Sequence, residues 1–275
     1  MIYISGSNGL IGTELTKNIQ NYIPISYRNQ YPEINFLPNS TLIHLSSSTT
    51  PRNNFDELQS SFNSDVLIPF KLFQNYLKVN PNGRIIFLST AGDLHSSESD
   101  IVSNEYTLPI PKSIYGTHKL LLENYTKLLH SQYDFVSIIL RTTNVYGGKI
   151  DSKRVNGLID KLISNNNEIV ITSNVKTTAN FIHISDLISL ILQSLDVSVE
   201  GFNLFLVGSK KSISIQDLIE KISTYISLNI VFKNENSNPS YINIDTSKVQ
   251  KYFNWKCKYS IDSGIIKQVQ SLNSL

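Results

Sequence analysis

The 275-residue sequence predicts an α/β fold, a doubly wound parallel sheet with helices on both faces. Short runs rich in Ile, Leu and Val alternate with stretches of helical periodicity, as expected of strand–helix–strand units with right-handed crossovers. A glycine-rich turn follows the first run, and polar residues follow several others. Ligands bind beyond the carboxyl ends of the strands in such sheets, so these polar positions form the candidate site.

The first half of the chain contains most of the expected elements. Residues 1–5 form an apolar strand, and Leu10, Ile11 and Leu15 recur at helical spacing after the glycine-rich turn. The segment between the second and third strands is too short for a helix and another strand, so the sheet should lack one strand or contain a compressed one. Further strands are expected at 22–27, 41–46, 84–90 and 135–141, and helices at 55–79 and 114–130.

The alternation of strands and helices loosens after residue 150. The later elements are expected to build a smaller lobe, with helices near 153–165, 184–195 and 214–226. We therefore predict a Rossmann-like doubly wound parallel sheet with a smaller C-terminal α/β substrate lobe. The dinucleotide-binding domain is placed at 1–150, with part of 180–210 returning to it, and the substrate-binding lobe at 151–275.

Composition limits the class of protein. Hydrophobic residues make up 40% of the chain and charged residues 17%, and the formal charge of +2 leaves no basic stripe for nucleic acid. Cys257 is the only cysteine, which excludes intramolecular disulfides and favours a reducing compartment. No apolar run approaches the roughly 20 residues of a membrane span, and the strand at 1–5 leaves no signal peptide before it. We predict a cytoplasmic protein with a small-molecule substrate and no nucleic-acid or membrane partner.

The first candidate site is the turn Gly6-Ser7-Asn8-Gly9-Leu10-Ile11-Gly12, whose glycines are spaced GxxGxxG. Between a strand and a helix, Gly6 would permit the tight turn and Gly9 would let the backbone approach a pyrophosphate. Gly12 would let the helix pack close to the strand, and the helix N-terminus would attract the phosphates. The alternative is a strand-to-helix turn without a ligand. The favoured prediction is that these seven residues bind NAD or NADP.

The second strand ends in Tyr27-Arg28-Asn29, where an acidic residue usually binds the adenosine ribose. The Arg28 guanidinium could bind a 2′-phosphate, which slightly favours NADP over NAD. An ordinary solvated surface arginine is the equal alternative.

The second candidate site is the pair Tyr115 and Lys119, which lie on one face of a helix. A lysine ammonium near a phenol stabilises the phenolate, so the pKa of Tyr115 should fall toward neutrality. A hydroxyl from the end of the preceding strand, Thr90 or its neighbour Ser89, would bind the substrate oxygen. His118 should point elsewhere on the helix. Without the glycine-rich turn, a packed tyrosine and a solvated lysine would be the better interpretation.

Other polar residues give weaker signals. Asp186 and Asp217 flank apolar helical segments, so helix capping is predicted for both. Metal-ligand spacing is absent among the histidines His44, His95, His130 and His183, and no metal site is predicted.

With these residues identified, the chain resembles the extended short-chain dehydrogenase/reductase family, in its NAD-dependent epimerase/dehydratase group. The resemblance implies that Leu45, Ser46 and Ser47 pass beneath the cofactor and that Asn63 is the family's asparagine on the next helix. It also implies that Lys119 holds the nicotinamide ribose. The matching segments are Leu-Ile-His-Leu-Ser-Ser at 42–47, Leu-Arg-Thr-Thr-Asn-Val-Tyr-Gly-Gly at 140–148, Asn-Phe-Ile-His-Ile-Ser-Asp-Leu at 180–187 and the Asp-Thr-Ser-Lys segment through Trp255 at 245–255.

The sequence departs from the family pattern around the substrate. Gly92-Asp93-Leu94-His95 stands where the family usually has Val-Tyr-Gly. Two arginines that commonly contact a substrate diphosphate are missing, with Ala179 in place of one and none at 237–241 for the other. The residues expected to bind substrate are therefore Asn144 together with Lys149, Lys153, Arg154 or Lys176.

The resemblance implies a nucleotide-sugar enzyme, most often one of polysaccharide biosynthesis. Tyr115, as phenolate, would take a hydroxyl proton while hydride passes to the nicotinamide. The family's common activities favour an epimerase or dehydratase. Arg28 and the short segment between the second and third strands favour an NADPH-dependent reductase of a nucleotide-linked 4-keto sugar. A dinucleotide-binding regulatory protein without turnover is the alternative of another class. The family also implies a homodimer formed through the helices at 55–79 and 114–130.

Overall fold

The computed structural model describes residues 1–27, 31, 33–53, 55–97, 101–148, 158–164, 168–233 and 237–272. A six-stranded sheet lies at its centre, in the order β11-β6-β4-β3-β1-β2, and every neighbouring pair of strands is parallel. The prediction of a Rossmann-like α/β fold is confirmed. The strands are β1 (Ile2–Ser5), β2 (Tyr22–Ile25), β3 (Thr41–His44), β4 (Arg84–Thr90), β6 (Val136–Thr142) and β11 (Phe202–Val207).

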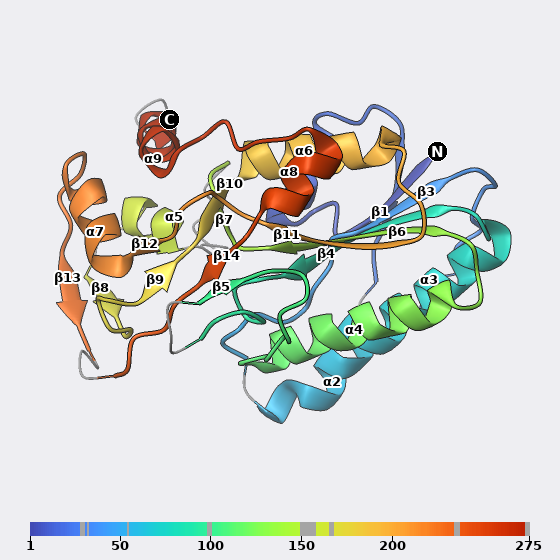
Figure 1. The fold of residues 1–275 in the computed structure, drawn as a ribbon, viewed down its shortest axis with the longest axis horizontal. Helices are drawn as coiled ribbons and strands as arrows, with labels where there is room; N and C mark the ends of the chain where they lie inside the picture. Colours follow the sequence, from blue (N-terminus) through green and yellow to red (C-terminus); the bar gives the residue numbers. More distant parts are fainter. Residues whose placement is uncertain are drawn as a thin grey trace.

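Helices cover both faces of the sheet (Figure 1). Successive residues of a strand point to opposite faces. Tyr3 accordingly packs in the core on the side of α3 and α4, and Ile4 packs in the core on the side of α1 and α6. The helices are α1 (Leu10–Thr16), α6 (Ile184–Asp196) and α8 (Ser247–Phe253) on one face, with α3 (Ile68–Val79) and α4 (Ile114–His130) on the other.

β2 is an edge strand of the sheet, and a short connection leads from it to β3. Within residues 1–27, 31 and 33–53, no strand lies between β2 and β3, as the length of the segment predicted. The connection is instead tied to β1, because the Tyr3 hydroxyl donates to the Asn35 carbonyl at 3.1 Å and accepts from Leu37 N–H at 2.9 Å. The Phe36 ring packs edge-on against Tyr3.

The segment predicted as one helix at 55–79 is helical throughout but changes its geometry. It comprises a 3₁₀ turn η1 (Phe55–Glu57), α2 (Leu58–Phe62), a π-helical turn η2 (Asn63–Leu67) and α3. Pro69 is the second residue of α3, and a proline can neither donate to the carbonyl four residues earlier nor tolerate it at close range. The wider π turn relieves that conflict, and such turns often occur at functional sites.

A smaller group of elements lies beyond the carboxyl ends of the sheet strands, at the left of Figure 1. Its separate core contains Leu162, Leu218 and Ile265. The domain boundary predicted at residue 150 stays a prediction. The segment 180–210, part of which was expected to return to the first domain, contains α6 and β11, and both elements lie with the central sheet. The elements of this group are β7 (Asn144–Tyr146), α5 (Leu158–Ser164), β8 (Ile169–Ile171), β9 (Thr178–Ala179), β10 (Phe181–His183), β12 (Ile213–Ser214), α7 (Ile215–Ser223), β13 (Ile230–Phe232) and α9 (Ile261–Leu272).

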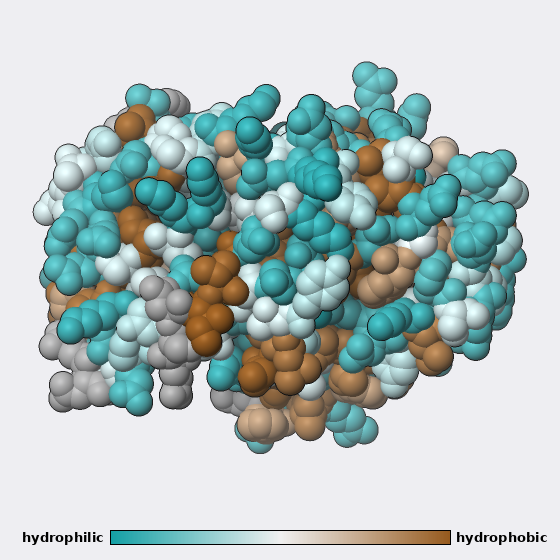
Figure 2. Space-filling view, in the orientation of Figure 1, coloured by the Kyte–Doolittle hydropathy of each residue, from teal (hydrophilic) through white to brown (hydrophobic). Residues whose placement is uncertain are grey.

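A two-stranded ladder of β5 (Val102–Ser103) and β14 (Asn243–Ile244) joins this group to the loop after β4. Figure 2 shows a mixed surface, with hydrophobic side chains gathered near the lower edge, where Figure 1 places α2 and the start of α4. Among the described residues, no helix is both long and apolar enough to cross a membrane.

Candidate active site

The glycine-rich turn after β1 has the geometry that its spacing predicts. Gly6 has φ of +79°, a conformation that favours glycine. A Cβ on Gly12 would lie 2.1 Å from the Gly6 carbonyl oxygen, so only glycine fits where α1 meets the turn. A Cβ on Gly9 would meet only that same oxygen, at 3.3 Å. Apart from its two neighbours in the chain, no other atom of the described residues lies within 4 Å of that Cβ position, which leaves room for a ligand next to Gly9.

The turn after β1 and the loop after β3 lie side by side. The strand order reverses between β1 and β3, which is where ligands bind in open parallel sheets. A Cβ on Gly6 would lie 2.8 Å from the Ser46 nitrogen, and Leu45 N–H donates to the Ser5 carbonyl at 3.0 Å. The Ser46 hydroxyl also donates to the Tyr27 hydroxyl at 3.3 Å, which brings the end of β2 to the same place. The two cofactor-binding segments predicted from the sequence are thus adjacent.

A buried carboxylate, Asp65, fixes the loop after β3. It accepts hydrogen bonds from the Ser47 hydroxyl at 3.1 Å, from Ser48 N–H at 2.6 Å and from Thr49 N–H at 3.0 Å. Asp65 lies in the π turn that Asn63 begins, so this turn positions the predicted cofactor-binding loop. Asp65 was not predicted, because its only signal in the sequence is a single acidic residue inside an apolar helical segment.

Tyr115, Lys119 and Thr90 come together at the carboxyl edge of β4. The Ser113 side chain caps α4 by accepting from Gly116 N–H at 3.2 Å, which sets the first turn that carries Tyr115. The Tyr115 hydroxyl shares a hydrogen bond with the Thr90 side chain. The Lys119 ammonium lies 5.7 Å from the centre of the Tyr115 ring and donates to the Leu88 carbonyl at 3.0 Å.

The protonation of this group differs from the prediction. Burial raises the pKa of Tyr115 to about 12, and the hydrogen bond from Thr90 lowers it only in part. Burial also lowers the pKa of Lys119 to about 8, against the opposing effect of Asp65 and Glu123. The expected fall of the Tyr115 pKa toward neutrality is therefore wrong for this structure, because burial and the carboxylates of Asp93 and Asp65 outweigh the hydrogen bond from Thr90. Tyr115 is a neutral phenol here.

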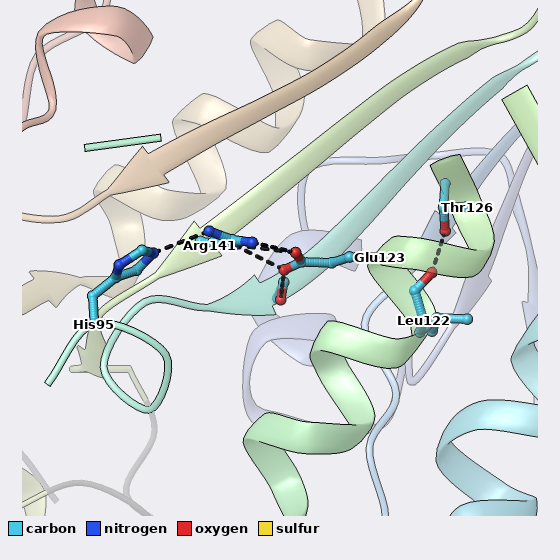
Figure 3. Close-up of polar contacts among 6 residues, drawn as sticks. His95, Leu122, Glu123, Thr126 and Arg141 are labelled. Carbon is cyan, nitrogen blue, oxygen red and sulfur yellow. Dashed lines mark hydrogen bonds and ion pairs between the residues drawn. The ribbon is translucent and has the colours of Figure 1, made fainter. Parts of the chain in front are cut away.

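Ser89, the other predicted hydroxyl, belongs to a buried polar network that also contains Glu123, Arg141 and His95, which Figure 3 labels. Its hydroxyl donates to the Glu123 carboxylate, which pairs with Arg141 at 2.6 Å. Neighbouring strand residues point to opposite faces, so Thr90 and Ser89 cannot both meet the phenol. Glu123 went unnoticed in the sequence, although it follows Lys119 by one helical turn on the same face of α4.

The predicted substrate-binding residues are only partly described. Asn144 is exposed, and its amide donates to the Asn180 carbonyl at 3.0 Å, which ties β7 to β10. Lys176 is exposed, and its backbone N–H donates to the Asn174 side chain. The basic residues outside the described part of the chain are Arg28, Lys149, Lys153 and Arg154.

Two predicted helix caps are wrong. Asp186 accepts from Lys258 N–H at 2.9 Å and Tyr259 N–H at 3.1 Å, so it anchors the segment before α9. The cap of α6 is His183, whose ring accepts from Ser185 N–H. Asp217 lies in the first turn of α7 and donates its N–H to the capping residue Ser214. Among the described residues, no group of three potential ligands is arranged to hold a metal ion.

The parallel sheet and the two adjacent loops at its switch point form the arrangement at which open α/β sheets bind ligands. Residues 34–208 match the sequence profile of the NAD dependent epimerase/dehydratase family. This match spans more than half of the chain, and the protein belongs to that family. The Escherichia coli dTDP-4-dehydro-6-deoxyglucose reductase is 28% identical over 239 residues, which cover 84% of this chain and 74% of the relative.

Solved structures share the fold across the whole chain. MoeE5 in complex with UDP-glucuronic acid and NAD has a TM-score of 0.88 at 18% identity, covering 100% of this chain and 99% of that one. The Bacillus cereus UDP-glucuronic acid 4-epimerase, in complex with UDP-glucuronic acid and NAD, has a TM-score of 0.84 at 19% identity and covers 99% of each chain. The predicted fold, and the prediction of a nicotinamide-dependent enzyme of this family, are confirmed.

Proposed function

We propose that this protein is a nucleotide-sugar enzyme of the epimerase/dehydratase type, in which Tyr115 moves a proton at a sugar carbinol. The observation that carries the proposal is the meeting of Tyr115, Thr90 and Lys119 at the sheet edge. The Lys119 ammonium also lies 3.5 Å from the carbonyl of Ser46, whose backbone packs against Gly6 of the glycine-rich turn. The relative and the neighbouring structures bear the names of enzymes or complexes of dTDP- and UDP-linked sugars, which supports the same substrate class.

The residues present fit a nicotinamide dinucleotide. Gly9 leaves open space above the turn, and the loop at 45–47 lies against Gly6. In this proposal these two segments hold the pyrophosphate and the adenosine side, and Lys119 binds the nicotinamide ribose. When bound, the dinucleotide supplies an acceptor and donor of hydride. Whether it is NAD or NADP depends in part on Arg28.

The side chains divide the proton chemistry between them. Tyr115, once deprotonated, accepts the proton of the sugar hydroxyl as hydride leaves the carbinol carbon, and returns that proton when a ketone is reduced. Thr90 donates a hydrogen bond to the same oxygen, on which charge develops. The ammonium of Lys119 stabilises the phenolate that forms next to it. Ser89 has no part in this chemistry because its hydroxyl is held by Glu123.

A reductase of a nucleotide-linked 4-keto sugar is the second candidate, and two observations favour it. Tyr115 is held as a neutral phenol with a pKa of about 12, which is the form that donates a proton to a ketone oxygen. The Escherichia coli relative is itself named as a reductase of such a sugar. A binding protein without turnover is less well supported, because it has no need to keep Tyr115, Lys119 and Thr90 together.

The first experiment is to denature the purified protein and identify any released nucleotide by chromatography. Tightly retained NAD indicates a cofactor recycled within each turnover and supports an epimerase or dehydratase. NADP, or no retained nucleotide, supports the reductase and directs the search to keto-sugar substrates.

The second experiment tests the acid/base role with Tyr115→Phe on a panel of UDP- and dTDP-linked sugars and keto-sugars. Turnover should fall by roughly 10²- to 10⁴-fold while cofactor affinity stays the same. Full activity of Tyr115→Phe would show that the mechanism is wrong. Normal cofactor affinity of the wild-type protein without turnover on any panel member would support the binding protein instead.

A further inference from the structure

His95 ends the buried polar network of Figure 3, and its ring is held in one orientation. The side chain is only 4% exposed, and its Nε2 lies 3.0 Å from Nη1 of Arg141. A guanidinium has donors and no acceptor, so Nε2 of His95 must be the acceptor. Burial and the charge of Arg141 lower the pKa of His95 to about 4, so the ring is neutral near pH 7. Its one hydrogen is therefore on Nδ1.

This Nδ1–H has no hydrogen-bond partner among the described residues. A buried donor without an acceptor costs about 1–3 kcal/mol, and proteins keep few of them. Rotation of the ring would not relieve the cost, because it would break the contact with Arg141. No acceptor atom of the described residues meets this donor, so its acceptor would come from a bound molecule.

The position of His95 indicates which molecule this is. His95 follows Thr90 in the loop after β4, and its N–H donates to the Ala91 carbonyl at 2.9 Å. Ala91 N–H in turn donates to the Thr142 carbonyl at 2.7 Å, at the carboxyl end of β6. On the other side, Ser97 exchanges backbone hydrogen bonds of 3.0 and 2.8 Å with Tyr241. The loop thus lies between the carboxyl edge of the sheet and a segment of the C-terminal lobe, where open sheets bind ligands.

We propose that His95 determines sugar specificity by donating its Nδ1–H to a hydroxyl or carbonyl oxygen of the substrate's sugar. The inference rests on the proposed function, since it requires a nucleotide-linked sugar in front of Thr90 and Tyr115. A site built to satisfy a fixed donor rejects sugars that lack the matching oxygen, because the donor would then stay unpaired.

Two variants of His95 distinguish the role of Nε2 as acceptor from the role of Nδ1 as donor. In His95→Gln the side-chain carbonyl can still accept from Arg141 in place of Nε2, but no donor remains at the position of Nδ1. In His95→Asn the shorter amide keeps a donor near Nδ1 and loses the acceptor for Arg141. Titration calorimetry on NAD-saturated protein would compare UDP-glucose with UDP, and dTDP-glucose with dTDP. Thermal unfolding of each variant would report on the network itself.

We expect His95→Gln to weaken binding of the nucleotide sugars by roughly three- to tenfold, with binding of UDP, dTDP and NAD unchanged. His95→Asn should retain more of the sugar affinity and unfold at a lower temperature. Unchanged affinity of His95→Gln for the nucleotide sugars would overturn the inference and leave the proposed function intact. Equal losses for the sugars and the free nucleotides would also overturn it, since His95 would then only support Arg141. A wild-type protein that binds NAD but no nucleotide or nucleotide sugar would refute the proposed function, and this inference with it.

Discussion

Replacing Glu123 by glutamine tests whether the buried network supports the fold around the site. Three ion pairs occur among the described residues, and only Glu123–Arg141 is buried, with side chains 3% and 5% exposed. Arg141 Nη2 lies 2.6 Å from one carboxylate oxygen, and Nε lies 3.0 and 3.1 Å from the two. Glu123→Gln keeps the shape and one acceptor but leaves the guanidinium charge of Arg141 without a counterion.

The size of the effect follows from this geometry. Removing one partner of a buried ion pair costs about 3–5 kcal/mol, because the remaining charge is uncompensated. Glutamine can still accept one hydrogen bond from Arg141, so we expect the lower end, about 3 kcal/mol of unfolding free energy. At roughly 2–4 °C per kcal/mol for a chain of this size, the melting temperature should fall by about 6–12 °C.

Urea unfolding followed by tryptophan fluorescence measures this change. Trp255 is the only tryptophan, it is 4% exposed, and its indole N–H donates to the Ser189 hydroxyl at 2.8 Å, so its emission reports on the packed core. The matched control is Asp262→Asn, which breaks an ion pair of the same 2.6 Å separation whose side chains are 40% and 55% exposed. Water screens that pair, and we expect almost no change. Coincident unfolding midpoints for the two variants would refute the reasoning.

Three further predictions concern the cofactor loops and the acid/base pair. Gly12→Ala should lose both stability and NAD binding, because its Cβ would lie 2.1 Å from the Gly6 carbonyl oxygen. In Gly9→Ala the Cβ would lie 3.3 Å from the same oxygen, so this variant should lose NAD binding alone. Calorimetry and urea unfolding measure both effects, and wild-type NAD affinity in Gly9→Ala would contradict the assignment. Asp65→Asn should weaken NAD binding by roughly tenfold, because the loop after β3 loses its charged acceptor, and unchanged affinity would rule this out. Lys119→Met should be inactive yet more stable than wild type at pH 7. Burial lowers the pKa of Lys119 from 10.5 to about 8, so the cost of the buried charge is fully present below pH 8 and disappears as the pH rises toward 10.5. The stability difference should shrink over that range, and a difference independent of pH would contradict the assignment.

Local patterns in the sequence were sufficient to predict the fold and to select Tyr115, Lys119 and Thr90, which the structure brings together. The alternation of strands and helices, the glycine-rich turn and the helical spacing of Tyr115 and Lys119 each depend on neighbours within a few residues. The same locality explains why the shortened connection after β2 could be predicted from its length alone. The homodimer and the division into two domains stay predictions, since they depend on contacts that such patterns do not contain.

The rest of the site was decided by distances between segments far apart in the chain. Only the packing of α4 against β4 shows that Thr90 meets Tyr115 while Ser89 meets Glu123. Asp65 has a role because the π turn carries it to the loop after β3, which its sequence position does not indicate. The protonation of Tyr115 could not be predicted from its spacing to Lys119, because burial, a property of the assembled structure, is the largest cause of its raised pKa.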